Sequence, residues 1–178
     1  MISSHSHYFR CRRRAAVAVE TAFMMPFLLG LIVGVWELGR LIQVQEIMQN
    51  AAREGARVAS QATIINSTGA YTEVAVTASN PNVTDTVKQY LQGAGITNLT
   101  GLQVTFTYLN GDMTLTHPYQ GVKNQQFRVT VSLPFSNVKW SSLNLINPSS
   151  VGGTCIWNIL VDDPFTVNTT LPGWTPPP

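Results

Sequence analysis

Residues 15–35 read AAVAVETAFMMPFLLGLIVGV, and this stretch decides how the chain is organised. It holds 21 residues with a single charged side chain, Glu20. An α-helix rises 1.5 Å per residue, so a helix of this length spans about 31 Å, close to the thickness of the hydrocarbon core of a bilayer. We therefore predict a membrane-spanning helix from Ala15 to Val35.

The residues on either side of the apolar stretch indicate its orientation. Cytoplasmic flanks of membrane helices are rich in Lys and Arg, so residues 1–14 are predicted to stay in the cytoplasm and the C-terminal part to be exported. The alternative is a cleaved secretory signal peptide, whose apolar core is about 7 to 15 residues long and ends at an A-x-A-like site. This stretch is longer and is followed by WELGRLIQVQE. The basic residues that precede it are Arg10, Arg12, Arg13 and Arg14.

The composition excludes several classes of protein. Of the 178 residues, 44% are hydrophobic and only 11% are charged, whereas soluble domains carry about 25% charged residues. The net charge of +2, with its arginines gathered in the leader, predicts a membrane partner and no nucleic-acid partner. The two cysteines, Cys11 and Cys155, exclude a disulfide framework. They are expected on opposite sides of the membrane, which leaves Cys155 either buried or bridged to another chain.

Helical periodicity continues beyond the predicted membrane span. Apolar or small residues recur at steps of three and four, without a proline, as far as Ala59. The sequence therefore predicts one continuous helix from Ala15 to about Ser60. Its outer half carries a stripe of small residues, which either admits a second helix or sheet at short range or packs on the chain's own exported domain. The stripe consists of Ala51, Ala52, Gly55, Ala56 and Ala59.

Three residues inside the span affect how the helix bends and packs. Pro26 removes a backbone donor opposite the carbonyl of Ala22, so a bend is expected there. Gly30 and Gly34 form a G-x-x-x-G pattern, which lets membrane helices approach closely. The alternative is that both glycines face lipid, since glycine is common in membrane helices.

Glu20 is the residue of the span that most needs an explanation. A charged side chain at the centre of a membrane helix costs about 2.5–3.5 kcal/mol on insertion scales, so it requires a partner or a shallow position. Glu20 lies five residues beyond Ala15, about 6–8 Å along the helix. Either it lies near the head groups and pairs with the arginines of the leader, or it is matched by the free amine of a new N-terminus.

The N-terminal quarter of the chain combines several features that are specific only together. From about Arg14 to Ala59 these are the basic leader, AVAVE, a proline within the span, WELGR and NAAREGARVA. Together they resemble the TadE-like family of tight-adherence pilus proteins, pilin-like or pseudopilin components of a type IV-related machine. The resemblance implies a protein of the bacterial inner membrane, with possible incorporation into an extracellular pilus. It also implies three partners: a prepilin peptidase, other pilin-like subunits and an inner-membrane assembly platform.

The resemblance further implies how the leader is processed. Cleavage on the cytoplasmic side, between Ala15 and Ala16, makes Glu20 the fifth residue of the mature chain. Similar leaders usually have glycine just before the cut, where this sequence has Ala15. Alanine is the next smallest side chain for a protease subsite that binds the backbone closely.

Beyond Ser60 the pattern predicts a small α+β domain. A helix is expected to start at Asn80–Pro81 and to end at Gly93. Alternating apolar residues predict strands, and Asn110–Gly111 predicts a hairpin turn between two of them. The fold class is therefore α+β, a long N-terminal helix followed by an antiparallel sheet of three or four strands with one short helix. The segments expected to form strands are 102–108, 113–115, 127–133 and 155–161.

The chain is predicted to have four parts. Residues 1–15 form a cytoplasmic leader that is cleaved, and residues 16–60 form the long helix, which spans the membrane to about residue 35. Residues 61–168 form the exported domain. Residues 169–178 form a proline-rich tail of extended, polyproline-type structure.

No catalytic, cofactor or metal site is predicted. His117 has no second histidine or cysteine pair nearby in the sequence, and such a lone histidine is more often structural than a ligand or a base. Asp162 and Asp163 are adjacent, so in a strand they point to opposite faces. No phosphate-binding glycine loop, nucleophile elbow or metal-ligand spacing occurs. The chain is expected not to be an enzyme and to bind no small-molecule substrate.

Two functions remain open from the sequence. The first is a pilin-like structural or assembly component of a tight-adherence or type IV-like pilus or secretion system. The second is an uncleaved bitopic membrane protein whose exported domain binds a partner. A mature N-terminus at Ala16 favours the first, and retention of residues 1–15 favours the second.

Overall fold

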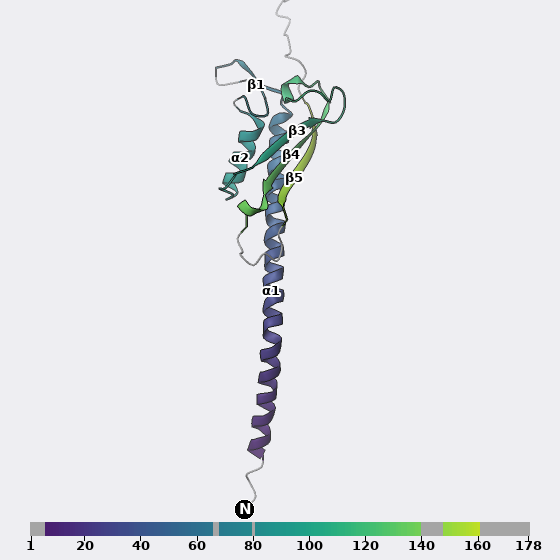
Figure 1. The fold of residues 1–178 in the computed structure, drawn as a ribbon. Coiled ribbons are helices and arrows are strands. Elements are labelled where there is room, and N and C mark those ends of the chain that lie inside the picture. Colours follow the sequence, from purple (N-terminus) through teal and green to yellow (C-terminus); the bar gives the residue numbers. More distant parts are fainter. Residues whose placement is uncertain (1–5, 66–67, 80, 140–147, 161–178) are drawn as a thin grey trace, which may run out of the picture. The chain divides into compact units, whose positions relative to one another are not determined.

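The computed structural model describes residues 6–65, 68–79, 81–139 and 148–160. Its helices and strands confirm the predicted α+β class, with a long N-terminal helix, antiparallel strands and one further, short α-helix (Figure 1). Two single 3₁₀ turns, η1 and η2, flank β4 in the sequence. In chain order the elements are α1 (Ser6–Ala59), β1 (Thr63–Ile65), β2 (Tyr71–Glu73), α2 (Val83–Gly93), β3 (Gln103–Tyr108), η1 (Pro118–Gln120), β4 (Gln126–Pro134), η2 (Phe135–Asn137) and β5 (Ser150–Asn158).

Helix α1 contributes to two compact units. The first contains α1 as far as Gln43, and the second begins at Val44 and contains the rest of α1, α2 and both sheets. The helix starts at Ser6, earlier than the predicted Ala15, because residues 6–14 contain no proline or glycine to stop it. It continues through Pro26 as helix, and the bend expected there stays a prediction.

The main sheet has the strand order β3-β4-β5, with both pairs antiparallel. Its central strand, β4, alternates as predicted, and the side chains on its inner face are completely buried. The ring of Phe106 on β3 stacks on one of them, Phe127, with 5.0 Å between the ring centroids. The core therefore lies on this face of the sheet. The buried residues of β4 are Phe127, Val129, Val131 and Leu133.

The last four turns of α1 pack on the inner face of β5 at very short range. A Cβ atom added to Gly153 would lie 2.5 Å from the Cα of Gln49 and 2.5 Å from the carbonyl oxygen of Met48. No side chain fits between two backbones at this distance. The side chain of Gln49 strengthens the contact, because its amide bonds both the N–H and the C=O of Thr154, at 3.1 and 2.7 Å.

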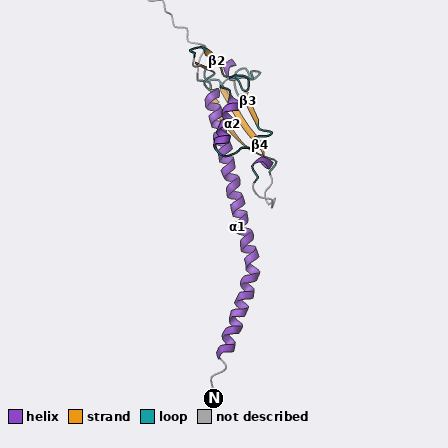
Figure 2. Cartoon of the chain, turned by 90° about the vertical axis from the view of Figure 1, so that its left-hand side faces the viewer, coloured by secondary structure: helices purple, strands orange, loops and turns teal. Residues whose placement is uncertain are grey.

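Helix α2 packs against the same part of α1 (Figure 2). A Cβ added to Gly55 would lie 2.9 Å from Cγ2 of Val87 and 3.3 Å from Cγ1 of Val83. The absence of a side chain at Gly55 therefore lets the two helices approach. Val83, Val87 and Leu91 form the buried face of α2, whereas Tyr90 is exposed.

The predicted start of α2 at Asn80–Pro81 is wrong by two residues. The helix is capped by Asn82, whose Oδ1 accepts a hydrogen bond of 2.7 Å from the N–H of Asp85. The Nδ2 group of Asn82 also donates to the carbonyl of Ser79 and to the carboxylate of Asp85, each at 2.8 Å. This network fixes the first helical residue at Val83.

We expect Asn82→Ala to lower the free energy of unfolding by about 1 kcal/mol, because the N-terminal amides of α2 lose their acceptor. Thermal unfolding of the full chain in detergent micelles, followed by circular dichroism, measures this loss. Gln92→Ala, at an exposed position of the same helix, is the matched control and should change stability by less than about 0.5 kcal/mol. Equal stability of the two variants would contradict the capping role of Asn82.

The predicted turn at Asn110–Gly111 does not lead into a strand at 113–115. Instead, β3 pairs with β4 across a long connection. The Oδ1 atom of Asn110 accepts a hydrogen bond of 2.7 Å from the N–H of Gln126, and its carbonyl accepts one of 2.9 Å from Nε2 of Gln125. The strand that pairs with β3 is therefore β4, and not the predicted strand at 113–115.

Two further strand predictions need correction. β5 begins at Ser150, five residues before the predicted Cys155, because Gly152 and Gly153 carry no side chain to give the alternating pattern. The two-stranded sheet of β1 and β2 was not predicted, since each strand is only 3 residues long. The predicted proline-rich tail, 169–178, lies outside the described residues.

Candidate membrane helix and assembly residues

The first unit presents an apolar helix surface. Every side chain from Val17 to Ile32 is exposed, including Phe23 at 87% and Val19 at 72%. The described part of the chain contains one helix that is long and apolar enough to cross a membrane, with a mean hydropathy of 1.9 over its most apolar window. An exposed apolar surface of this size is unfavourable in water, so it requires lipid or other helices around it.

Few polar side chains lie on this segment, and one of them bonds within the helix. The hydroxyl of Thr21 donates to the carbonyl of Val17 at 2.6 Å, which satisfies it without water. Gly30 and Gly34 lie one turn apart, and a Cβ added to either would meet no atom within 4 Å. The space beside both glycines is therefore open to lipid or to another helix.

Glu20 is the charged residue on this apolar surface. It is exposed, and within the residues whose side chains are described it forms no salt bridge. It lies one helical turn from Ala16, on the same side of α1. Ala15 and Ala16 both lie within α1, while their side chains and those of the leader arginines lie outside the described residues.

The stripe of small residues in the outer part of α1 is covered by the chain's own domain. Its four alanines are 0% exposed, and Gly55 faces α2. Of the two interpretations of the stripe, the structure shows the second, in which the stripe packs on the chain's own folded domain. This face of α1 is therefore already occupied. The buried alanines are Ala51, Ala52, Ala56 and Ala59.

Sequence reasoning missed Glu37, the acidic residue of WELGR. Its side chain is only 5% exposed, and its Oε2 atom has no hydrogen-bond partner among the described residues. A signal was available, because Glu37 is the first acidic residue after the apolar stretch and lies two residues beyond Val35. Like Glu20, a carboxylate at that place requires a partner or a shallow position in the membrane.

His117 makes contacts within the domain through both its ring and its backbone carbonyl. Its ring stacks on Tyr119, with 5.4 Å between the centroids, and its carbonyl accepts a hydrogen bond of 2.9 Å from the hydroxyl of Tyr108. Burial raises the pKa of Tyr108 to about 12, so this phenol remains a donor at neutral pH. These contacts hold η1 against the end of β3.

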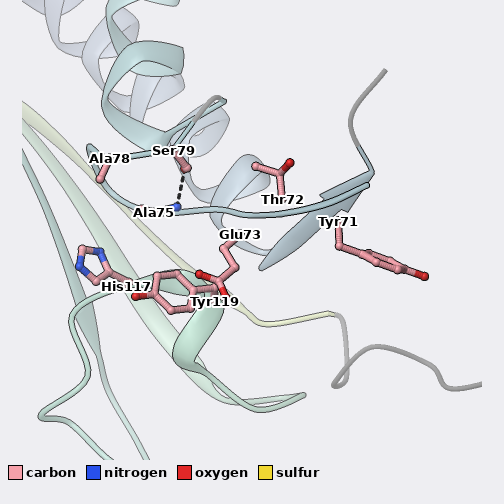
Figure 3. Close-up of a pocket in the computed structure, with 8 residues that line it drawn as sticks. All are labelled: Tyr71, Thr72, Glu73, Ala75, Ala78, Ser79, His117 and Tyr119. Atoms are coloured by element: carbon pink, nitrogen blue, oxygen red, sulfur yellow. Dashed lines mark hydrogen bonds between the residues drawn. The ribbon is translucent and has the colours of Figure 1, made fainter. Parts of the chain in front are cut away.

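A hollow of about 520 Å³ lies beside His117 and Tyr119 (Figure 3). Glu73 and Ser79 also line it, but the hydroxyl of Ser79 is engaged with the N–H of Ala75 at 2.7 Å. The ring of Tyr71 lies apart from the other labelled side chains (Figure 3). Within the described residues no group of three or more His, Cys, Asp or Glu side chains is placed to hold a metal ion.

Cys155 is half-buried on β5 and forms no disulfide within the described residues. Burial raises the pKa of its thiol, and the nearby charge of Arg53 only partly opposes this. The thiol is therefore protonated and weakly nucleophilic at neutral pH. Asp162 and Asp163 and the side chain of Cys11 lie outside the described residues.

One family model matches part of α1. The family model described as TadE-like protein matches residues 15–57. These residues are similar to that family. The match confirms the resemblance predicted for the apolar span and the part of α1 that follows it, whereas the basic leader, residues 1–14, lies before the matched residues. No curated protein matches the chain, and no solved structure matches it.

Proposed function

We propose that this protein is a pilin-like structural component, a pseudopilin, of a tight-adherence pilus. One observation carries the proposal: the apolar segment of α1 is exposed from Val17 to Ile32, and the same helix ends buried in a folded domain. The TadE-like match covers both parts of the helix. Such a chain works by helix packing and not by catalysis.

The charge distribution supports an orientation in the bacterial inner membrane. The leader carries four arginines before the apolar segment, and positive flanks stay on the cytoplasmic side. In this orientation the second unit, from Val44 onward, is exported. The membrane, other pilin-like subunits and the assembly platform of the pilus are then the partners.

Processing by a prepilin peptidase between Ala15 and Ala16 is part of the proposal. We expect Ala15→Phe to lower the yield of mature protein about tenfold or more, because a subsite shaped for a small side chain rejects a large one. The ratio of precursor to mature chain, measured by mass spectrometry of the membrane fraction, gives the effect. Ala15→Gly is the matched control and should be cut at least as well as the wild type. Normal maturation of Ala15→Phe would place the cut elsewhere.

Electron microscopy of sheared fibres tests the structural role. A tagged copy of the protein is expected in the fibre fraction, or in the membrane with the pilin-like subunits to which it crosslinks. A tagged protein that keeps residues 1–15 and crosslinks to no pilin-like subunit would favour the second function, an uncleaved membrane protein with an exported binding domain.

A further inference from the structure

The hollow beside His117 and Tyr119 is lined by three segments of the second unit (Figure 3). Strand β2 contributes Glu73, the stretch from Ala75 to Ser79 contributes small side chains, and η1 with the residue before it contributes His117 and Tyr119. Small side chains leave room, and the volume of about 520 Å³ lies within the range of ligand pockets in proteins. The hollow can therefore admit a side chain of another molecule.

Hydrogen bonds hold each of these segments in place. The N–H of Val74, directly after β2, donates to the carbonyl of Ala62 at 2.8 Å. The hydroxyl of Ser79 accepts a bond of 2.7 Å from the N–H of Ala75, and η1 is held by the phenol bond to the carbonyl of His117. The hollow is therefore formed before a ligand arrives, and binding does not have to order its lining.

The charge of the lining is negative. Glu73 is the acidic residue among the eight that line the hollow, and none of the eight is a lysine or an arginine. Its side chain is exposed and forms no salt bridge within the described residues. Figure 3 shows this side chain pointing toward the part of the hollow where Tyr119 lies. A carboxylate in this position attracts a cation and repels an anion.

The aromatic part of the lining favours an organic cation over a metal ion. A metal ion takes several oxygen or nitrogen ligands, and in the described part of the chain no three His, Cys, Asp or Glu side chains come together. The ring of Tyr119 is parallel to that of His117 within 11°. The face of an aromatic ring attracts cations, and arginine is the commonest of them in proteins.

We propose that this hollow binds the guanidinium group of an arginine side chain on another protein molecule. Two N–H groups of the planar guanidinium donate to the carboxylate of Glu73, and its plane lies over the ring of Tyr119. A lysine ammonium is a compact point charge and has no plane to stack, so it suits the hollow less well. The inference concerns the second unit alone and does not rest on leader cleavage or on the pilin-like role.

A titration followed by nuclear magnetic resonance tests the proposal, with the full chain in micelles of an uncharged detergent. The probe is N-acetyl-arginine amide, whose only charge is its guanidinium group. We expect saturable changes in the amide signals of Glu73, His117 and Tyr119. N-acetyl-citrulline amide has nearly the same shape without the charge and should bind about fivefold more weakly or worse. Equal binding of the two probes, or changes that do not saturate, would overturn the proposal.

Two substitutions test the two parts of the lining separately. Glu73→Gln keeps the shape of the side chain and should weaken binding of the arginine probe about fivefold or more. Glu46→Gln, at an exposed position of α1 that does not line the hollow, is the matched control and should bind as the wild type does. Tyr119→Leu keeps the carboxylate and should weaken binding about threefold. Wild-type affinity in either Glu73→Gln or Tyr119→Leu would overturn the proposal.

The same signals distinguish the two sources of the arginine. If a second copy of the chain supplies it, the signals of Glu73 and Tyr119 change with protein concentration in the absence of the probe, and Glu73→Gln removes this change. Binding of the probe without such a dependence assigns the arginine to a different protein.

Discussion

Gly153→Ala is expected to lower the free energy of unfolding by about 3 kcal/mol, the upper end of what overpacking costs in a protein core. The added Cβ would lie 2.5 Å from the Cα of Gln49 and from the carbonyl oxygen of Met48. Both atoms belong to the backbone of α1, so no side-chain rotation relieves the clash. The helix and the sheet must move apart, which also weakens the bonds between Gln49 and Thr154.

Denaturation of the full chain in detergent micelles, followed by tryptophan fluorescence and circular dichroism, measures this effect. Gly93→Ala is the matched control, because a Cβ added at the last residue of α2 meets no atom within 4 Å. It should leave stability unchanged or raise it by up to about 1 kcal/mol. If Gly153→Ala were as stable as Gly93→Ala, α1 and β5 would not be in contact at this point.

Glu20→Gln is expected to leave membrane insertion and leader cleavage intact and to abolish most assembly. The proposed cleavage before Ala16 would create an amine at the edge of the bilayer, one helical turn from Glu20. A neighbouring subunit displaced along the helix axis would then pair its own amine with this Glu20. Any other displacement leaves a charge unpaired in a medium of low dielectric constant, at a cost of a few kcal/mol. Glutamine removes the preference for one displacement.

Membrane extraction with crosslinking, together with counts of pili, measures the loss of assembly. Thr21→Val is the matched control, since the hydroxyl of Thr21 already donates its proton to the carbonyl of Val17 in its own helix and carries no charge. Wild-type crosslinked complexes and normal numbers of pili in Glu20→Gln would reduce Glu20 to a shallow residue paired with head groups.

Local patterns in the sequence predicted the parts of the fold that depend on neighbouring residues. The charge-poor run of residues 15–35 and the helical periodicity after it predicted α1, and the alternation in β4 predicted its buried face. The long connection between β3 and β4 could not be predicted, because it depends on Asn110 bonding residues that are far away in the chain. The start of β5 could not be predicted either, because Gly152 and Gly153 have no side chains to give the alternating pattern.

The candidate site, too, was predicted only in part. Charge and hydropathy in the sequence were sufficient to single out Glu20 and the leader. The partner of the small-residue stripe could not be predicted, because alanine and glycine admit a foreign helix and the chain's own domain equally well. The structure decides this point through Gly55 and Gly153, where α2 and β5 occupy the space.

The mass of the intact protein extracted from bacterial membranes tests the central claim most directly. A pilin-like subunit with this helix is predicted to have lost its leader, so that the mature chain begins at Ala16 and Glu20 is its fifth residue. A mass that still includes residues 1–15, in cells that carry an active prepilin peptidase, would contradict the account.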